Sequence, residues 1–175
     1  SVFHGFGSSW VIPETGILLN NRLTGFSLDP QSPNIIAPGK RPAHTLNAFT
    51  AVHPDGSLYL VGGTPGANIQ VQSNLQLLIN VIDLKMNVQE ATEAPRWQHL
   101  NAAGQSSEEE KGAGVLEIEN RVSAEVLEQL RAKGHEVKAL SAWGHGSSVQ
   151  MMEVLANGTF AFGSDPRCEG QACGI

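Results

Sequence analysis

The pattern of apolar and polar residues predicts a β-hairpin in the first half of the chain. Leu46–Val52 and Leu58–Val61 have the composition of short strands. Pro54-Asp55-Gly56 lies between them and has the chemistry of a tight turn. Shorter apolar runs at Trp10–Ile12 and Gly16–Leu19 flank another candidate turn. The first third of the chain is therefore predicted to consist of strands and turns.

A second hairpin is predicted near the end of the chain. Val149–Val154 and Phe160–Gly163 flank Asn157-Gly158, a dipeptide typical of two-residue hairpin turns. Two more strands are predicted between the hairpins, at Val115–Ile118 and Glu136–Leu140. The chain thus carries strands in both halves, with the intervening residues left for helices.

Three segments place apolar residues at helical spacing. The predicted helices are residues 69–86, 88–93 and 124–133. Asn68 is the expected N-cap of the first helix, and Ser123 is the expected N-cap of the third. Pro95 limits the second helix, and Gly134 stands where a glycine commonly ends a helix.

The order of these elements indicates the fold class. Strands occur in adjacent pairs with helices between the pairs, without strict alternation of strand and helix, which favours antiparallel sheets layered with helices. A chain of 175 residues is most simply a single domain over residues 1–175. We therefore expect an α+β domain.

Composition and charge exclude several classes of function. A formal net charge of −6, without a cluster of Lys and Arg, argues against nucleic-acid binding. Apolar runs all fall short of the ~20 residues of a membrane span. The start of the chain lacks Met and a basic leader, so we expect a processed chain or an excised piece. Cys168 and Cys173 are compatible with a small disulfide loop or with free thiols, and they do not decide the compartment.

The stretch "GGTPGANI" (62–69) raises the first question of chemistry. It follows a predicted strand and precedes a predicted helix, where backbone N–H groups lack partners and lie at the positive end of the helix dipole. Such groups can stabilise a phosphate or an oxyanion. The glycine spacing does not match nucleotide-binding motifs. The residues alone leave an ordinary strand–helix turn and an oxyanion site both open.

The histidines give weaker indications. None of the six has the spacing of a zinc site, so no metal or cofactor is predicted. His145 lies in "WGHGSS" beside Ser147 and Ser148, which could form a Ser–His pair. The composition of a flexible loop explains the same residues equally well.

Five segments together resemble the small subunit of γ-glutamyltranspeptidases and the related cephalosporin acylases, in the N-terminal nucleophile hydrolase superfamily. In chain order they are "GILLNNR" (16–22), "PGKRPAHTL" (38–46), "GGTPGANI" (62–69), "VQEATEAPRW" (88–97) and "GSDPR" (163–167). The resemblance implies an αββα sandwich, in which two stacked antiparallel sheets lie between helix layers. It also implies a precursor that cuts itself, so that a new N-terminal Thr becomes the nucleophile and its α-amine becomes the base.

Three residues take catalytic positions in this resemblance. Gly66 and Ala67 match the oxyanion-hole positions. The nucleophilic Thr is expected upstream of Ser1, so the chain looks like most of a small subunit without its nucleophile strand. Ser1 matches a hydroxyl residue that supports the nucleophile's amine, and the alternative of Ser1 as the nucleophile is less compatible with the register.

The positions that hold the γ-glutamyl head group in the family are changed here. Arg22 and Gly25 replace acidic or amide positions near the substrate amine, His44-Thr45 replace a Ser-Ser pair, and Phe3 replaces an Asn. A guanidinium repels an ammonium group and favours an anionic acyl chain, such as glutaryl. The alternative is that Arg22 pairs with a local carboxylate such as Glu14.

The resemblance implies an amide hydrolase or acyltransferase that works through an acyl-enzyme on γ-glutamyl or similar acyl amides. It implies a large subunit of the same precursor as partner and a small-molecule amide as substrate. A cephalosporin or glutaryl acylase is one alternative, and a non-catalytic structural or binding fragment is another. Family members are often exported, so a periplasmic or extracellular location stays open.

Overall fold

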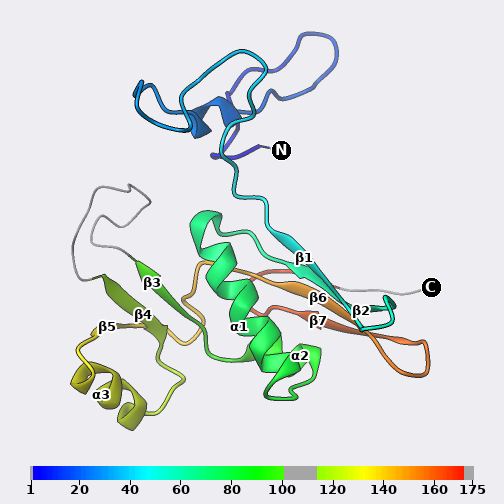
Figure 1. The fold of residues 1–175 in the computed structure, drawn as a ribbon, viewed down its shortest axis with the longest axis vertical. Coiled ribbons are helices and arrows are strands. Elements are labelled where there is room, and N and C mark those ends of the chain that lie inside the picture. Colours follow the sequence, from blue (N-terminus) through cyan, green and yellow to red (C-terminus); the bar gives the residue numbers. More distant parts are fainter. Residues whose placement is uncertain (1, 101–113, 172–175) are drawn as a thin grey trace. The chain divides into compact units, whose positions relative to one another are not determined.

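The computed structural model describes residues 2–100 and 114–171 (Figure 1). Its contacts divide the chain into two compact units, Ser1–Thr45 and Leu46–Ile175. Ser1 and Cys173 lie outside the described residues. Within the described ranges, no helix has the length and apolar character needed to cross a membrane.

The first unit is built mainly from turns, with one short 3-10 helix, η1 (Arg22–Gly25). The predicted turn after Ile12 is present, because the N–H of Ile12 donates to Ile17 O at 2.9 Å. The strands predicted on either side of it reduce to a single bridge between Val11 and Leu18. Short apolar runs without a packed sheet neighbour do not extend into strands.

A four-stranded antiparallel sheet forms the centre of the second unit. Its strands are β1 (Ala48–Val52), β2 (Leu58–Gly63), β6 (Gln150–Val154) and β7 (Phe160–Ser164), in the order β1-β2-β6-β7. Both predicted hairpins are confirmed as β1–β2 and β6–β7. The β2–β6 pairing joins the two hairpins, with Gly62 opposite Met151.

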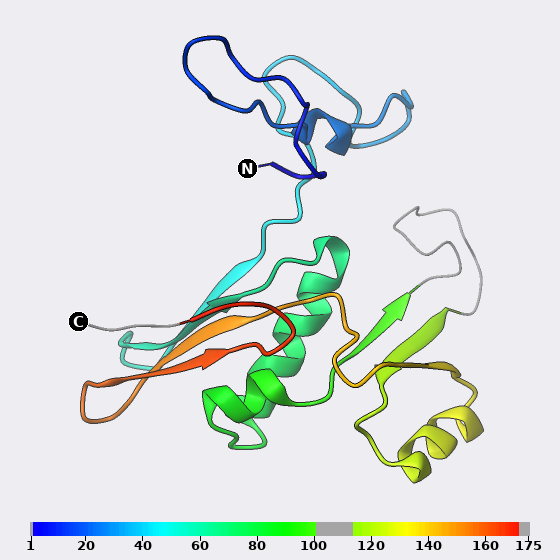
Figure 2. The same cartoon turned by 180° about the vertical axis from the view of Figure 1, so that it is seen from behind.

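Helices α1 (Gln70–Ile82) and α2 (Val88–Glu93) cover one face of this sheet (Figures 1 and 2). Leu60 and Met151 from the sheet pack with Leu77 and Val88 from the helices in the buried core. A capping box between Asn87 and Glu90 starts α2, since each side chain accepts a hydrogen bond from the other residue's N–H.

The predicted N-cap of the first helix is wrong. Asn68 lies inside a short 3-10 turn, η2 (Ala67–Ile69), which leads directly into α1, and Ile69 occupies the N-cap position without a side-chain hydrogen bond. The predicted helix also ends earlier, because Lys85 adopts a positive φ of 60°. The predicted bounds of the second helix, Val88–Glu93, are confirmed.

A second, smaller sheet contains β3 (Trp97–Leu100), β4 (Val115–Glu119) and β5 (Glu136–Leu140). Helix α3 (Ala124–Ala132) connects β4 to β5, which pair in parallel. The mixed α+β class is confirmed, but the expectation of antiparallel pairing is wrong for β4 and β5. A helix long enough to cross over lets two sequential strands run in the same direction.

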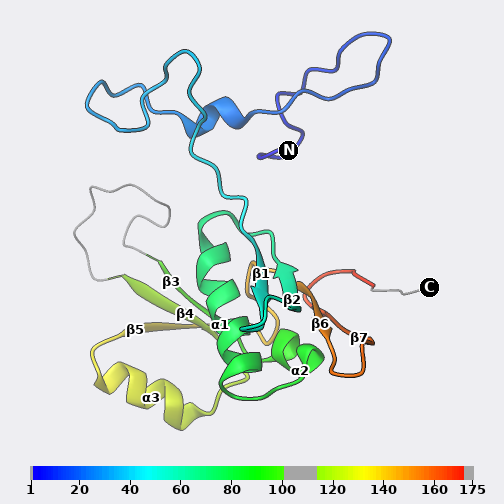
Figure 3. The same ribbon diagram turned by 45° about the vertical axis from the view of Figure 1, so that its right-hand side comes forward.

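Two glutamines of α1 cover the free edge of β3. Gln76 accepts from Trp97 N at 3.1 Å and donates to Trp97 O at 2.8 Å. Gln72, one helical turn earlier, accepts from His99 N at 2.8 Å and donates to His99 O at 3.0 Å. These side-chain amides replace a neighbouring strand, so α1 contacts both sheets (Figure 3).

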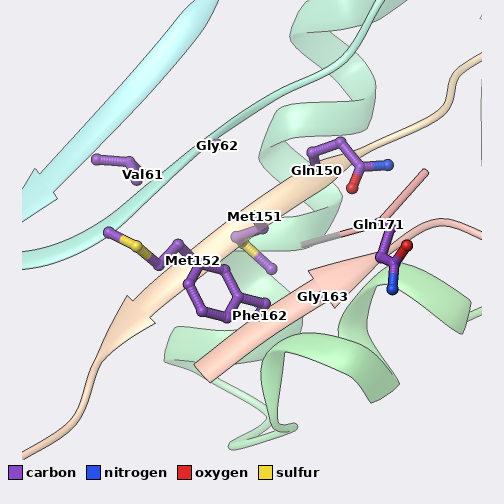
Figure 4. Close-up of a pocket in the computed structure, with 8 residues that line it drawn as sticks. All are labelled: Val61, Gly62, Gln150, Met151, Met152, Phe162, Gly163 and Gln171. Carbon is purple, nitrogen blue, oxygen red and sulfur yellow. The ribbon is translucent and has the colours of Figure 1, made fainter. Parts of the chain in front are cut away.

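The face of the main sheet opposite α1 and α2 carries a row of aligned side chains. One residue from each strand belongs to this row, and each is paired with the next across neighbouring strands: Thr50, Val61, Met152 and Phe162. Several of them line a shallow hollow of about 290 Å³, together with Gln150 and Gln171 (Figure 4).

Candidate active site

The corner between β2 and α1 exposes backbone donors. Gly66 has φ 137° and ψ 17°, and Ala67 has φ 49°. Among the described residues, neither the N–H of Gly66 nor that of Ala67 finds a hydrogen-bond acceptor. Positive φ is uncommon for a residue with a side chain, and such strained backbone is concentrated at functional sites. Two adjacent N–H groups are therefore available to an outside acceptor.

The carbonyls of the same corner are satisfied. Gly66 O accepts from Ile69 N at 3.1 Å, which forms the first turn of η2. Pro65 O accepts from Thr64 Oγ1 at 2.7 Å, and Thr64 Oγ1 itself accepts from Ser148 N at 2.9 Å. A side chain at position 66 would place its Cβ 2.8 Å from Ile69 Cγ1, so glycine is required by space as well as by φ.

Behind this corner lies a buried network of charged side chains. Arg96 pairs with Asp165 at 2.7 Å, and Arg167 pairs with Asp165 at 2.9 Å and with Glu119 at 2.5 Å. Arg121 reaches Glu119 at 2.7 Å from the other side. Three guanidinium groups thus meet two carboxylates, and buried charges of this kind are stable only when paired and hydrogen-bonded.

The pKa values of the two carboxyl groups reflect this pairing. Burial alone would raise the pKa of Glu119, but hydrogen bonds from Arg167 and Arg121 outweigh it and hold the pKa below its ordinary value. Burial also opposes ionisation of Asp165, while the N–H groups of Arg167 and Val149 lower its pKa. Both groups are therefore carboxylates at neutral pH.

His145 and Ser147 join the network to the corner. Ser147 Oγ accepts from Arg96 Nη1 at 2.8 Å and lies 2.8 Å from His145 Nδ1. Ser147 N donates to the same Nδ1 at 3.1 Å, so His145 is neutral with its proton on Nε2. Burial and the nearby guanidinium of Arg96 lower the pKa of His145 to about 4. The open question of a Ser–His pair is settled geometrically, although both side chains are buried and shielded by Arg96.

No role was predicted from the sequence for the four charged residues Arg96, Glu119, Asp165 and Arg167. Arg96, Asp165 and Arg167 do fall within segments that carry the family resemblance, whereas Glu119 does not. A charged residue at the end of an apolar strand, as in "VLEIE" (115–119), was the available signal for Glu119. Two of its partners, Arg96 and Arg167, are 23 and 48 residues away in the chain, which spacing alone does not predict.

In the first unit, two of the predicted substrate residues lie together. The guanidinium of Arg22 lies over the ring of Phe3, 4.7 Å from its centroid. The side chain of Asn21 fixes the backbone beside Phe3, because its Oδ1 accepts from Phe3 N and His4 N at 3.1 Å each. This contact is a cation–π interaction.

The remaining predicted substrate residues lie on the same unit. A Cβ at Gly25 would collide with the backbone oxygen of Ala43, so this close backbone approach requires glycine. His44 is exposed, and Thr45 is half-buried. Ser1, the predicted support for the amine, falls outside the described residues.

Comparison with known proteins defines the class. The γ-glutamyltranspeptidase family model matches residues 1–175, so the chain belongs to the γ-glutamyltranspeptidase family. An oxamate amidohydrolase proenzyme of Klebsiella pneumoniae is 37% identical over 178 residues, which are 99% of this chain and 32% of that protein. A glutathione hydrolase proenzyme of Escherichia coli is 37% identical over 172 residues, 93% of this chain and 27% of that protein.

A solved structure agrees with these relatives. The cephalosporin acylase from Bacillus halodurans matches with a TM-score of 0.80 and 32% identity, covering 95% of this chain and 29% of that chain. The chain therefore spans about a third or less of the length of each of these three proteins. The recognised family is confirmed, and the relatives are named as hydrolases and proenzymes.

Proposed function

We propose that the chain is most of the small subunit of an amide hydrolase or acyltransferase that works through an acyl-enzyme. The observation that carries the proposal is the pair of adjacent, unoccupied N–H groups at Gly66 and Ala67. Family membership supports it, because the named relatives act on amides: oxamate and glutathione.

The corner would act on the tetrahedral intermediate. A Thr upstream of Ser1 would attack the substrate carbonyl, and its own α-amine would accept the hydroxyl proton and pass it to the leaving amine. The oxygen that gains negative charge would then be bound by Gly66 N–H and Ala67 N–H. Donors that are already in position before the reaction stabilise this charge without having to reorganise. Loss of one such donor lowers kcat by about 10²–10³-fold. Ser1 would support the attacking amine.

The acyl group of the substrate is expected to carry a negative charge. The acyl pocket of the assembled enzyme would be shaped by the predicted substrate residues Arg22, Phe3, Gly25, His44 and Thr45. The charge of Arg22 favours an acyl group that carries a carboxylate and lacks an ammonium group. Oxamate is an anionic amide of this kind, which supports the same preference.

The partner would be the large subunit of the same precursor. We propose that residues 1–175 form one domain with it, as an αββα sandwich in which the row Thr50–Val61–Met152–Phe162 faces the partner's sheet. Phe160, 56% exposed at the end of this face, is the kind of large apolar side chain that such an interface buries.

The test uses the complete protein that contains this chain. We expect hydrolysis of an acyl p-nitroanilide, with glutaryl preferred over γ-glutamyl. Preference for the γ-glutamyl compound would contradict the role of Arg22. If neither anilide is hydrolysed and oxamate is not hydrolysed either, the proposal that the protein is an amide hydrolase would be contradicted.

Two alternatives have specific support. The similarity to a cephalosporin acylase favours an enzyme that removes the acyl side chain of cephalosporins, which turnover of a glutaryl cephalosporin, measured beside the glutaryl anilide, would identify. A non-catalytic fragment would be indicated if the residues encoded upstream of Ser1 lacked a Thr at the start of a strand.

A further inference from the structure

The directions of the N–H groups of Gly66 and Ala67 depend on the orientation of the peptide planes to which they belong. A trans peptide is planar, so its N–H and C=O point in opposite directions. The described chain contains no cis peptide bond. Whatever holds the carbonyl of Pro65 therefore also aims Gly66 N–H, and whatever holds the carbonyl of Gly66 also aims Ala67 N–H.

The two carbonyls are held by different means. Gly66 O is fixed by Ile69 N at 3.1 Å, which belongs to the helical turn itself. Pro65 O is fixed by a side chain, since Thr64 Oγ1 donates to it at 2.7 Å. The Pro65–Gly66 peptide needs such an anchor because glycine tolerates both orientations of the plane that precedes it.

The hydroxyl of Thr64 is in turn oriented from outside the corner. Ser148 N, on the segment that leads into β6, donates to Thr64 Oγ1 at 2.9 Å, which leaves the hydroxyl proton directed to Pro65 O. Thr64 is 8% exposed, so water does not readily replace either bond. Ser147, the neighbour of Ser148, is held by Arg96 at 2.8 Å.

We propose that Thr64 is a positioning residue that sets the direction of Gly66 N–H through the carbonyl of Pro65. This inference rests on the proposed function, because the N–H matters only if it binds the oxyanion. Without the hydroxyl, the Pro65–Gly66 plane is free to rotate, and one of the two donors is then aimed away from the substrate for part of the time.

The test replaces the hydroxyl in the complete two-subunit protein. Thr64→Val removes it and keeps the shape, while Thr64→Ser keeps it. The matched control is Thr92→Val, because Thr92 is also a buried threonine, and its hydroxyl donates to Gln89 O at 2.8 Å within α2. Both subunits are produced as separate chains, so that activity does not depend on self-cleavage, and kcat is expressed per titrated active site.

Thr64→Val is expected to lower kcat by about tenfold to a hundredfold, less than the loss of a whole oxyanion donor, with KM changed less than about twofold. Affinity for a boronic acid analogue of the acyl group, which forms a tetrahedral adduct, should fall by the same factor as kcat. Thr64→Ser and Thr92→Val should keep kcat within about threefold of the wild type.

Equal kcat values per active site for Thr64→Val and Thr92→Val would overturn the inference and assign Thr64 a purely structural role. If the valine variant does not fold, Thr64→Ala provides the same comparison with no added volume. An inactive wild type would instead overturn the proposed function, so the two failures are distinguishable.

Discussion

The backbone conformation of the corner predicts stability changes of opposite sign for substitutions at Gly66 and Ala67. Ala67 has φ 49° and Gly66 has φ 137°, yet only one of them is glycine. Replacing Ala67 by Gly removes the steric cost of the left-handed conformation. Replacing Gly66 by Ala introduces that cost and adds a Cβ next to Ile69.

The magnitudes follow from the backbone and the contacts. A left-handed residue with a Cβ costs roughly 1–2 kcal/mol, and glycine loses about 0.5–1 kcal/mol through the greater freedom of the unfolded chain. Ala67→Gly should therefore change the free energy of unfolding by between zero and about +1.5 kcal/mol. Gly66→Ala should lower it by about 2 kcal/mol, since the Cβ would lie 2.8 Å from Ile69 Cγ1 and φ 137° is strained for any side chain.

Urea unfolding of the assembled protein measures both changes, and kcat reports on the donors. Gly66→Ala should also lower kcat, while Ala67→Gly should retain it, because a glycine can keep the same orientation of the N–H. Marked destabilisation by Ala67→Gly, or none by Gly66→Ala, would refute the backbone conformation on which the oxyanion site is based.

Three further predictions concern the rest of the second unit. Gln76→Met removes both hydrogen bonds to Trp97 and should lower the free energy of unfolding by about 1–2 kcal/mol, whereas Gln129→Met, which loses one exposed contact to Glu125, should cost less than about 0.5 kcal/mol in the same urea titration. His145 binds a proton near pH 6.5 when unfolded but only near a pKa of about 4 when folded, so stability should fall by up to about 3 kcal/mol as pH drops from 6.5 to 4. His145→Asn, which supplies an acceptor in place of Nδ1, should flatten this part of the pH–stability curve, and an unchanged slope would contradict the buried neutral histidine. Met152→Asp on the open sheet face should abolish co-purification with the proposed large subunit, whereas Val126→Asp on α3 should not; equal retention of the partner by both would contradict the proposed interface.

Local sequence signals predicted the elements well where the determinants are local. The two hairpins, α2 and the cap of α3 at Ser123 follow from turn residues and capping chemistry within a few positions of one another. Strand β3 was missed because "WQHL" (97–100) has no apolar alternation, and its outer edge is held instead by glutamines of α1. The parallel β4–β5 pair was missed because pairing direction depends on the path of α3 across the sheet.

Local rules fail most clearly at the residues that the proposed function uses. An alanine with positive φ and five charged side chains packed behind the corner both oppose ordinary preferences for folding. The charged residues come from the end of β4 and from the segments just before β3, just after β4 and just after β7, and Arg96 among them binds Ser147. Because Ser147 adjoins Ser148, whose N–H orients Thr64, the same network that compensates its own buried charge also holds the corner rigid. The resemblance located the corner at Gly66 and Ala67, but only the long-range contacts explain how two backbone donors could stay aimed without a partner of their own.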